Sequence, residues 1–250
     1  MIKYKLTPSY QFLEKDLLNI KNIFKNDNKI IHNARNVLKI IPLNGMDIVV
    51  KAFKIPNFIN QFVYSYIRNS KAKKSYLNSI KLEKLQINTP SPIAFIEFYK
   101  NTFFKESFFL SLKFDYEITM ADVRDKEITD KENILKQFAR FSYDIHKKGV
   151  WHVDYSGGNI LINKNKDIYE FSLVDINRMK FQKIEAYKGL ENFNKFWFNE
   201  DDLKIIAKEY SICAGLNETK SINEIILQDK KLKEHVLRRR KLKALFKGRN

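Results

Sequence analysis

The sequence predicts a two-lobe α+β protein, with a small β-rich lobe over residues 1–115 and a helical lobe over residues 116–250. Runs that suit β-strands concentrate before residue 115, whereas segments with helical spacing of apolar residues dominate after it. A polar, glycine-containing stretch, Trp151 to Asn159, interrupts the helical lobe and precedes a hairpin-like segment. The function predicted for the chain depends on this stretch and on the end of the hairpin.

The first lobe is predicted to begin with a helix and to continue as strands. Apolar residues recur at helical spacing within residues 1–28, namely Tyr10, Leu13, Leu17, Ile20 and Phe24. Four strands are expected, at residues 35–42, 47–54, 93–99 and 107–114, and a helix is expected at residues 71–86. Asn44-Gly45 between the first two strands favours a hairpin, with a loop slightly longer than two residues.

The second lobe is predicted to be helical around one hairpin. Residues 120–149 have helical periodicity, with Phe138, Phe141 and Ile145 as the core stripe, and Gly149 is typical of a helix end. A strand at 160–162, a polar turn at 163–167 and a strand at 171–174 form the expected hairpin. Helices are expected again at 200–213 and 221–245.

The polar stretch contains His152, Asp154 and Asn159, in the order His, any residue, Asp, and then Asn five residues after the Asp. Phosphotransferases of the protein-kinase type need this spacing, because the Asp accepts the proton of the substrate hydroxyl and the Asn holds Mg²⁺. Asp175 ends the hairpin and suits the second metal ligand. The competing interpretation is that Asp154 and Asn159 cap turns around Gly157-Gly158. We favour phosphoryl transfer because three roles fall in order at workable spacings.

The strand at 47–54 offers a lysine for the α- and β-phosphates of a nucleotide. Its sequence Ile48-Val49-Val50-Lys51 resembles the kinase strand that carries this lysine. Val49 and Lys51 share one face by alternation, whereas Ala52 and Lys54 form a rival pair on the other face. We predict that Lys51 is the phosphate-binding residue.

An acidic partner for this lysine is expected on the helix at 71–86. Glu83 is the only acid between Asp47 and Glu97, so it is the candidate, although an exposed helix glutamate explains it equally well. A glycine-rich phosphate loop is missing, since Gly45 is the only glycine in the first 50 residues. Backbone amides in the His32 to Asn36 turn are the candidate replacement.

The residues around the predicted site also indicate the kind of acceptor. Phe114-Asp115-Tyr116 stands where a kinase presents backbone groups to adenine, and Ile176-Asn177 replaces the usual Phe-Gly after Asp175. No long activation segment precedes the aromatic cluster Phe193 to Phe198. This favours a small-molecule or glycolipid acceptor over a docked peptide. Arg178 suits a contact with phosphate, with the acceptor sugar or with an acid, and the sequence leaves these open.

HxxGVxHxDxxxGNIL at residues 146–161, followed by SLVDINRM, resembles the bacterial lipopolysaccharide core kinases, the Kdo/heptose kinase family. VVKAFKIPN at 49–57, KAKKSY at 71–76, INTPSPIAFIE at 87–97 and the basic C-terminus extend the resemblance over most of the chain. It implies a protein-kinase-like fold and transfer of phosphate from ATP, with Mg²⁺, to an inner-core sugar of a lipid A precursor, Kdo ahead of heptose. The family pattern places a glutamate near Leu77, where this chain has leucine.

Composition and charge limit where such a protein works. The chain has one cysteine, Cys213, and its first residues lack an apolar signal segment, so we expect a reducing, cytoplasmic location. The longest uncharged run, Ile55 to Ile67, is too short and polar to cross a bilayer. No His/Cys pair has metal-ligand spacing, so no zinc site is expected.

The net charge of +17 implies an anionic partner. Lys230 to Arg249 contains ten lysines and arginines and one glutamate, and Leu242, Leu245 and Phe246 lie beside the run Arg238 to Lys241. This predicts a peripheral enzyme held at the anionic inner membrane, with nucleic acid a less favoured partner. An apolar stripe within 57–68 is a second candidate membrane contact, although a core helix explains it better.

Two other functions remain open at this point. The same chemistry suits another acceptor, as in a RIO-like protein kinase or an aminoglycoside-type small-molecule kinase. The missing glycine-rich loop and Leu77 also allow a non-catalytic pseudokinase that binds RNA through its basic tail. An ATP turnover assay separates the enzymes from the binding protein.

Overall fold

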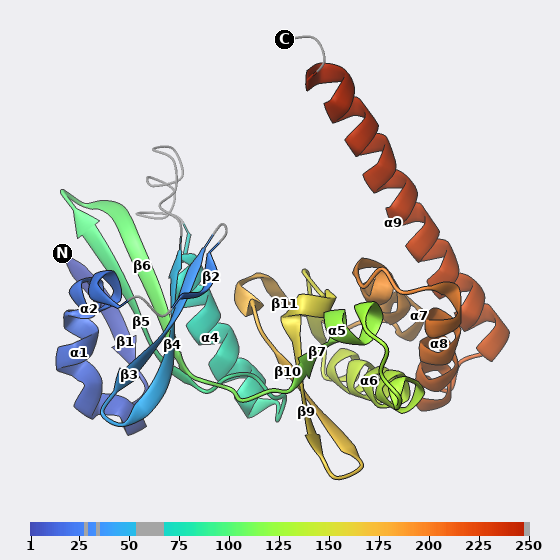
Figure 1. The fold of residues 1–250 in the computed structure, drawn as a ribbon, viewed down its shortest axis with the longest axis horizontal. Coiled ribbons are helices and arrows are strands. Elements are labelled where there is room, and N and C mark those ends of the chain that lie inside the picture. The colour runs from blue at the N-terminus through green and yellow to red at the C-terminus, as the bar shows by residue number, and fades with distance from the viewer. Residues whose placement is uncertain (28–29, 34–35, 54–67, 248–250) are drawn as a thin grey trace. The chain divides into compact units, whose positions relative to one another are not determined.

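The computed structural model describes residues 1–27, 30–33, 36–53 and 68–247, which form two compact units. The first unit comprises Met1–Asp115 together with Leu173–Arg178, and the second comprises Tyr116–Ser172 and Met179–Asn250. Strands gather in the first unit and helices in the second (Figure 1). The predicted α+β class is confirmed. The short segment 173–178, which was expected within the helical lobe, lies with the first unit.

A six-stranded antiparallel sheet forms the centre of the first unit, in the order β1-β5-β6-β4-β3-β2. The strands are β1 Ile2–Leu6, β2 Ile30–Asn33, β3 Val37–Leu43, β4 Met46–Phe53, β5 Pro92–Lys100 and β6 Phe103–Leu112. The four predicted strands correspond to β3, β4, β5 and β6. The two edge strands were not predicted, because β1 carries a largely exposed, lysine-containing sequence and β2 is only four residues long.

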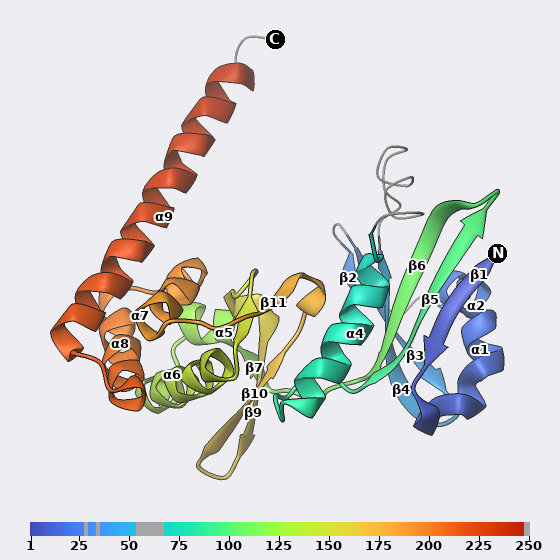
Figure 2. The same ribbon diagram turned by 180° about the vertical axis from the view of Figure 1, so that it is seen from behind.

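Helices cover both faces of this sheet (Figure 2). Side chains alternate between the faces of each strand. Val50 and Leu110 therefore pack with the N-terminal helices, whereas Phe95 and Phe109 pack with the helix that follows β4. The helices are η1 Pro8–Leu13, α1 Glu14–Leu18, α2 Ile20–Asn26 and α4 Lys71–Lys84.

The predicted N-terminal helix is three short helices, but its stripe is correct, since Leu13, Leu17 and Ile20 are buried against the sheet. A tight hairpin joins β3 and β4. Leu43 pairs with Met46, so the loop has two residues and is shorter than the loop expected from the sequence. Asn44 and Gly45 both have positive φ, 48° and 76°, as a type I′ turn requires. The apolar stripe predicted within 57–68 lies outside the described residues.

The second unit combines helices with two small sheets, ordered β10-β9-β7 and β11-β8. Its strands are β7 Ile118–Thr119, β8 Val150–His152, β9 Ile160–Asn165, β10 Ile168–Leu173 and β11 Met179–Phe181, with the last residue of β10 in the first unit. Its helices are α5 Met120–Asp125, α6 Lys131–Lys147, η2 Gly157–Asn159, α7 Ala186–Gly189, η4 Leu190–Lys195, α8 Glu200–Ala214 and α9 Glu218–Lys247. A last short helix, η3 Ile176–Arg178, belongs to the first unit.

Aromatic rings form the core of the second unit. Phe138 on α6 is fully buried, and its ring centroid lies 5.1–5.7 Å from those of four other rings, namely Tyr155, Phe171, Phe193 and Phe196. The predicted helix over 120–149 is therefore correct in its core stripe but consists of two helices, α5 and α6. Tyr155 belongs to the stretch between β8 and β9, so its burial in this core anchors that stretch.

The last helix, α9, is anchored to the rest of the second unit up to Lys233. Ser221, Ile225 and Asp229 are buried, whereas residues 237–242 are all exposed. Lys233 Nζ donates to the carbonyl oxygen of Phe198 at 3.2 Å and forms an ion pair with Asp229 at 2.6 Å. None of the helices in the described ranges combines the length and the apolar composition needed to cross a bilayer.

Candidate active site

Lys51 and Asp175 meet in the first unit, although 124 residues separate them in the sequence. Lys51 Nζ donates to Asp175 Oδ1 at 2.5 Å. The lysine side chain is 13% exposed and the aspartate side chain 31%, so the pair is partly withdrawn from water. A lysine in such a place needs a compensating negative charge. Lys51 lies on the α4 face of β4, where its Nζ is also 5.4 Å from the ring centroid of Phe53.

The turn that carries Asp175 is held by two asparagines. Asn177 Nδ2 donates to Asp175 Oδ1 at 2.7 Å, and Asn78 Nδ2 on α4 donates to the carbonyl oxygen of Ile176 at 2.7 Å. Asp175 has a φ of 54°, a left-handed conformation that is uncommon outside glycine and tolerated best by Asn and Asp. Such strain persists where surrounding contacts impose it, often at functional sites. Asn78 and Asn177 were both missed by the sequence analysis.

Glu83 does not join this group. It is exposed near the end of α4, and within the described residues it forms no ion pair with Lys51. Asn78 is the α4 residue that reaches the Asp175 turn, and Glu83 follows it by five positions. Five residues rotate a helix about 140° past a full turn, which points Glu83 away from that face. The rival lysine, Lys54, lies outside the described residues, as do residues 34 and 35 of the proposed phosphate-binding turn.

The second unit contains Asp154 and Asn159, and one hydrogen bond joins them. Asn159 Nδ2 donates to the main-chain carbonyl oxygen of Asp154 at 2.9 Å and to Ser156 Oγ at 3.3 Å. The five-residue spacing therefore closes a small loop in which the asparagine amide nitrogen faces inward. Its Oδ1 accepts no hydrogen bond from the described part of the chain. That oxygen remains available for a ligand outside the loop.

The loop between Asp154 and Asn159 packs closely on α5. A Cβ at Gly157 would lie 2.7 Å from the backbone nitrogen of Ala121, whereas a Cβ at Gly158 would meet nothing within 4 Å. The two adjacent glycines thus have different roles, and only the first is required by close backbone approach.

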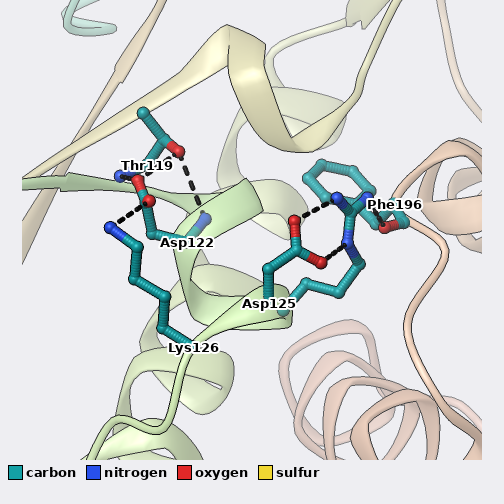
Figure 3. A network of polar contacts seen from close by, with 6 residues as sticks. Thr119, Asp122, Asp125, Lys126 and Phe196 are labelled. Atoms are coloured by element: carbon teal, nitrogen blue, oxygen red, sulfur yellow. Dashed lines mark hydrogen bonds and ion pairs between the residues drawn. The ribbon is translucent and has the colours of Figure 1, made fainter.

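The start of α5, on which Gly157 packs, is fixed by a capping box (Figure 3). Asp122 N donates to Thr119 Oγ1 at 3.3 Å, and Thr119 N donates to Asp122 Oδ2 at 2.8 Å. Hydrogen bonds from Lys126 and Thr119 hold the pKa of Asp122 at about 2, so the cap stays charged near neutral pH. Arg124, which binds Asp125, also donates to the carbonyl oxygen of Phe196 at 3.0 Å and so joins α5 to the residues after η4.

A buried polar chain supports the other side of the loop. His152 Nδ1 accepts a hydrogen bond from Asp154 N at 3.1 Å, and Asn192 Nδ2 donates to the carbonyl oxygen of His152 at 3.1 Å. Asn192 Oδ1 lies 3.1 Å from His146 Nε2, and Tyr210 Oη lies 3.0 Å from His146 Nδ1.

Burial lowers the pKa of His146 from 6.5 to about 4, so the ring is neutral near pH 7. Because Asn192 Oδ1 can only accept, Nε2 carries the proton and the Tyr210 hydroxyl donates to Nδ1. His146, Asn192 and Tyr210 therefore form a directed chain of hydrogen bonds that ends at the carbonyl oxygen of His152, just before the loop between Asp154 and Asn159.

One cation next to Asp154 was not predicted. Lys195, at the end of η4, donates from Nζ to the carbonyl oxygen of Val153 at 2.5 Å. The same Nζ lies 3.7 Å from Asp154 Oδ1. No spacing rule in the sequence links a lysine 41 positions downstream to this loop. The aromatic cluster Phe193 to Phe198 was the only signal that this segment is held in place.

The residues expected to hold a metal fit Mg²⁺ in the type of donor atom. Mg²⁺ in nucleotide enzymes takes one or two oxygen ligands from side chains and the rest from phosphates and water. Asp175 offers a carboxylate and Asn159 offers an amide Oδ1 turned out of its own loop. Within the described residues there is no group of three or more His, Cys, Asp or Glu side chains that could hold a metal. The donors present suit a metal that arrives with its nucleotide.

Comparison with known proteins gives one family and one fold. The model of the lipopolysaccharide kinase (Kdo/WaaP) family matches residues 60–211, a range that contains Asp154, Asn159, Asp175 and Lys195 and begins after Lys51. A solved structure described as WaaP in complex with acyl carrier protein superposes with a TM-score of 0.64 at 13% sequence identity. That comparison covers 93% of this chain and 98% of the solved one, and at this identity it shows the fold. No curated protein sequence matches the chain.

Proposed function

The chain belongs to the lipopolysaccharide kinase (Kdo/WaaP) family, and we propose that it transfers the γ-phosphate of ATP to a hydroxyl of Kdo in the lipopolysaccharide inner core. The predicted resemblance and the kinase-like fold are both confirmed by the comparisons. The protein is a phosphotransferase with a hydroxyl group as acceptor, and it acts on sugars of the lipopolysaccharide core. The choice of Kdo over heptose, and the role of each residue below, belong to our proposal.

The ion pair between Lys51 and Asp175 carries the catalytic part of the proposal. The two residues were selected separately in the sequence, one for its strand face and the other for its place after a hairpin. Their direct contact at 2.5 Å supports a shared task. Lys51 has three N–H donors, so it can keep Asp175 as a partner while it binds the α- and β-phosphates. Mg²⁺, held by Asp175 and Asn159, would neutralise charge on the β- and γ-phosphates.

Asp154 is assigned to the acceptor. Its carboxylate orients the sugar hydroxyl and takes its proton as the hydroxyl oxygen bonds to the γ-phosphorus. The bond from that phosphorus to the oxygen bridging the β- and γ-phosphates breaks in the same step, and ADP leaves. The side chain of Asp154 is 43% exposed, which allows a large glycolipid to approach it. Hydrogen bonds to its backbone N–H and C=O fix the backbone from which the carboxylate extends.

An acidic sugar suits this chain better than a neutral one. Kdo bears a carboxylate, whereas heptose does not, and the chain has a net charge of +17. Lys195 adds a cation next to the proposed base. Both observations favour an anionic acceptor over the cationic aminoglycosides considered above.

We also propose that the exposed half of α9 holds the enzyme at the inner membrane, where the lipid-linked acceptor resides. Leu237 and Leu242 are each 54% exposed, and they flank the exposed cations Arg238, Arg239, Arg240 and Lys241. Each cation near an anionic leaflet contributes about 1 kcal/mol of binding free energy, and less as salt rises. Removing residues 237–250 should cut flotation with anionic liposomes and activity on lipid-linked acceptor, while ATP hydrolysis stays largely intact. Flotation of the shortened protein at low salt would exclude α9 as the anchor.

The acceptor assignment is tested with the purified protein, ATP and Mg²⁺. Two lipid acceptors are compared, a lipid A precursor that ends in Kdo and one to which heptose has been added. We expect phosphate on the Kdo of the first acceptor, located by mass spectrometry of the released sugars. The Asp154→Asn variant serves as the control and should transfer at least about a hundredfold more slowly. Phosphate found only on heptose would contradict the assignment and leave the enzyme class unchanged.

A further inference from the structure

The catalytic loop contains no positive charge between Asp154 and Asn159. Its intervening residues are Tyr155, Ser156, Gly157 and Gly158. During phosphoryl transfer, negative charge spreads over the three equatorial oxygens of the moving group. Enzymes stabilise this charge with donors and cations that are already in place before the reaction. In addition, the carboxylate of Asp154 repels that charge. A fixed cation near Asp154 would relieve both problems.

Lys195 supplies such a cation from a distant part of the sequence. Its Nζ is fixed by the carbonyl oxygen of Val153 at 2.5 Å, the residue just before Asp154. The distance of 3.7 Å to Asp154 Oδ1 is within ion-pair range but longer than a direct hydrogen bond. Val153 uses one of the three N–H donors of the ammonium group. The side chain is 39% exposed, so the other donors can reach a bound phosphoryl group.

The backbone of Lys195 is tied to the same loop that carries Asp154. Phe193 and Phe196, on either side of it, are buried in the aromatic core, and Asn192 donates to the carbonyl oxygen of His152. Arg124 donates to the carbonyl oxygen of Phe196. Both ends of the Lys195 side chain are therefore held: its backbone by the neighbouring core residues, and its Nζ by the carbonyl oxygen of Val153. Less side-chain entropy remains to be lost when it binds phosphate than for a free surface lysine.

We propose that Lys195 is a catalytic residue that contacts the transferred phosphoryl group. The inference rests on the proposed function for the identity of the reaction. The acceptor oxygen bonds to phosphorus, the bond to the bridging oxygen breaks, the hydroxyl proton passes to Asp154 and ADP departs. Lys195 keeps its protons throughout and stabilises the charge on the equatorial oxygens. Lys195 on η4 thus supplies the positive charge that the residues between Asp154 and Asn159 lack.

The test compares Lys195→Met, which keeps the length of the side chain, with Lys195→Arg, which keeps its charge. Removal of one preorganised donor typically lowers kcat by about a hundredfold or more. We expect that loss in Lys195→Met, with the KM for ATP changed by less than about threefold, because the contact matters in the transition state. Lys195→Arg should retain kcat within about tenfold of the wild type. Rates are measured both for transfer to the Kdo acceptor and for ATP hydrolysis.

Lys188→Met is the matched control. Lys188 lies seven residues earlier, forms an ion pair with Glu191 and is 57% exposed. Its replacement removes one positive charge from the same segment and should leave kcat within about twofold of the wild type. A Lys195→Met enzyme with kcat within about threefold of the wild type would overturn the proposal. Equal losses in Lys195→Met and Lys195→Arg, together with lower unfolding temperatures, would show a structural role and also overturn it.

The two proposals fail in distinguishable ways. A wild-type protein that hydrolyses ATP but does not phosphorylate the Kdo acceptor would contradict the acceptor assignment. In that case, the role of Lys195 would still be tested by comparing the rates of ATP hydrolysis of Lys195→Met and the wild type. A wild-type protein without any ATP turnover would overturn both proposals.

Discussion

Lys51 and Asp175 in the first unit hold each other through their side chains, whereas the backbone of Asp154 in the second unit is held by the side chains of His152 and Asn159. The first pair is fixed by a direct charge contact at 2.5 Å, and Asn177 donates a further hydrogen bond to Asp175. In the described part of the chain, the cation nearest to the carboxylate of Asp154 is Lys195 Nζ at 3.7 Å, while the backbone N–H and C=O of Asp154 are bound by His152 and Asn159. In the proposed mechanism, the pair assigned to the phosphates is organised by its own charges, whereas the residue assigned as the base has a fixed backbone that leaves its carboxylate accessible.

The largest loss of activity should follow removal of the Asp154 carboxylate. Asp154→Asn keeps the size of the side chain but removes the carboxylate that is proposed to accept the proton, and we expect kcat to fall by about 10²- to 10⁴-fold. The thermal unfolding temperature should stay near that of the wild type, because the carboxylate is 43% exposed and the backbone contacts of the residue remain. Steady-state kinetics with ATP and the lipid acceptor measures the change. Near-normal kcat would remove Asp154 from the mechanism.

A large but different effect is expected for Lys51→Met. This variant removes the cation that is proposed to bind phosphate, and it also removes the ion-pair partner of the Asp175 carboxylate. We expect kcat/KM for ATP to fall by about a hundredfold, with the loss in both kcat and nucleotide affinity. Lys54→Met, on the rival position of the same strand sequence, is the control and should change kcat/KM little. If Lys54→Met proves the more damaging variant, the assignment of the phosphate lysine is wrong.

A moderate effect separates the two glycines of the loop. Gly157→Ala would place a methyl group 2.7 Å from a backbone nitrogen of α5, so something must shift. Overpacking of this kind costs about 1–3 kcal/mol in the free energy of unfolding. Gly158→Ala meets nothing within 4 Å and should be close to neutral. Chemical denaturation measures both variants, and equal stabilities would mean that α5 does not restrain the loop as described.

A smaller effect concerns pH and the buried frame of the loop. The pKa of His146 is depressed to about 4 in the folded protein, so below its ordinary value of 6.5 the unfolded chain binds more protons. The stability contributed by the neutral ring is fully present above pH 6.5 and is lost as pH falls toward 4. The free energy of unfolding of the wild type relative to His146→Gln should fall by about 2 kcal/mol between pH 7 and pH 5. A difference that does not vary with pH would show that His146 is not buried as a neutral ring.

The parts of the site that could be predicted from the sequence are those with local spacing. Asp154 and Asn159 are five residues apart on one loop, and strand alternation shows which face of the strand Lys51 occupies, although it leaves Lys54 as a rival on the other face. Asp175 could be placed because a hairpin of ordinary length precedes it. The helical stripe of Leu13, Leu17 and Ile20 followed in the same way from periodicity.

The missed residues act through contacts that no local pattern records. Asn78 reaches the Asp175 turn from 98 positions away, and Lys195 reaches Val153 from 42 positions away. Glu83 was selected because it was the only acid in its region, a criterion of composition that ignores which face of α4 it occupies. Polar contacts between residues far apart in the sequence depend on how the chain folds, so they can be identified only in the three-dimensional structure.

The central claim is that Asp154 and Asp175 serve one chemical step, and a double variant tests it most directly. Residues that act as a unit in catalysis lose activity non-additively, because the first loss leaves little for the second to remove. Single-turnover rates would be measured for Asp154→Asn, Asp175→Asn and the double variant, with ATP and the Kdo acceptor. We expect the double variant to be no more than about tenfold slower than the slower single variant. Losses that multiply fully would contradict the account.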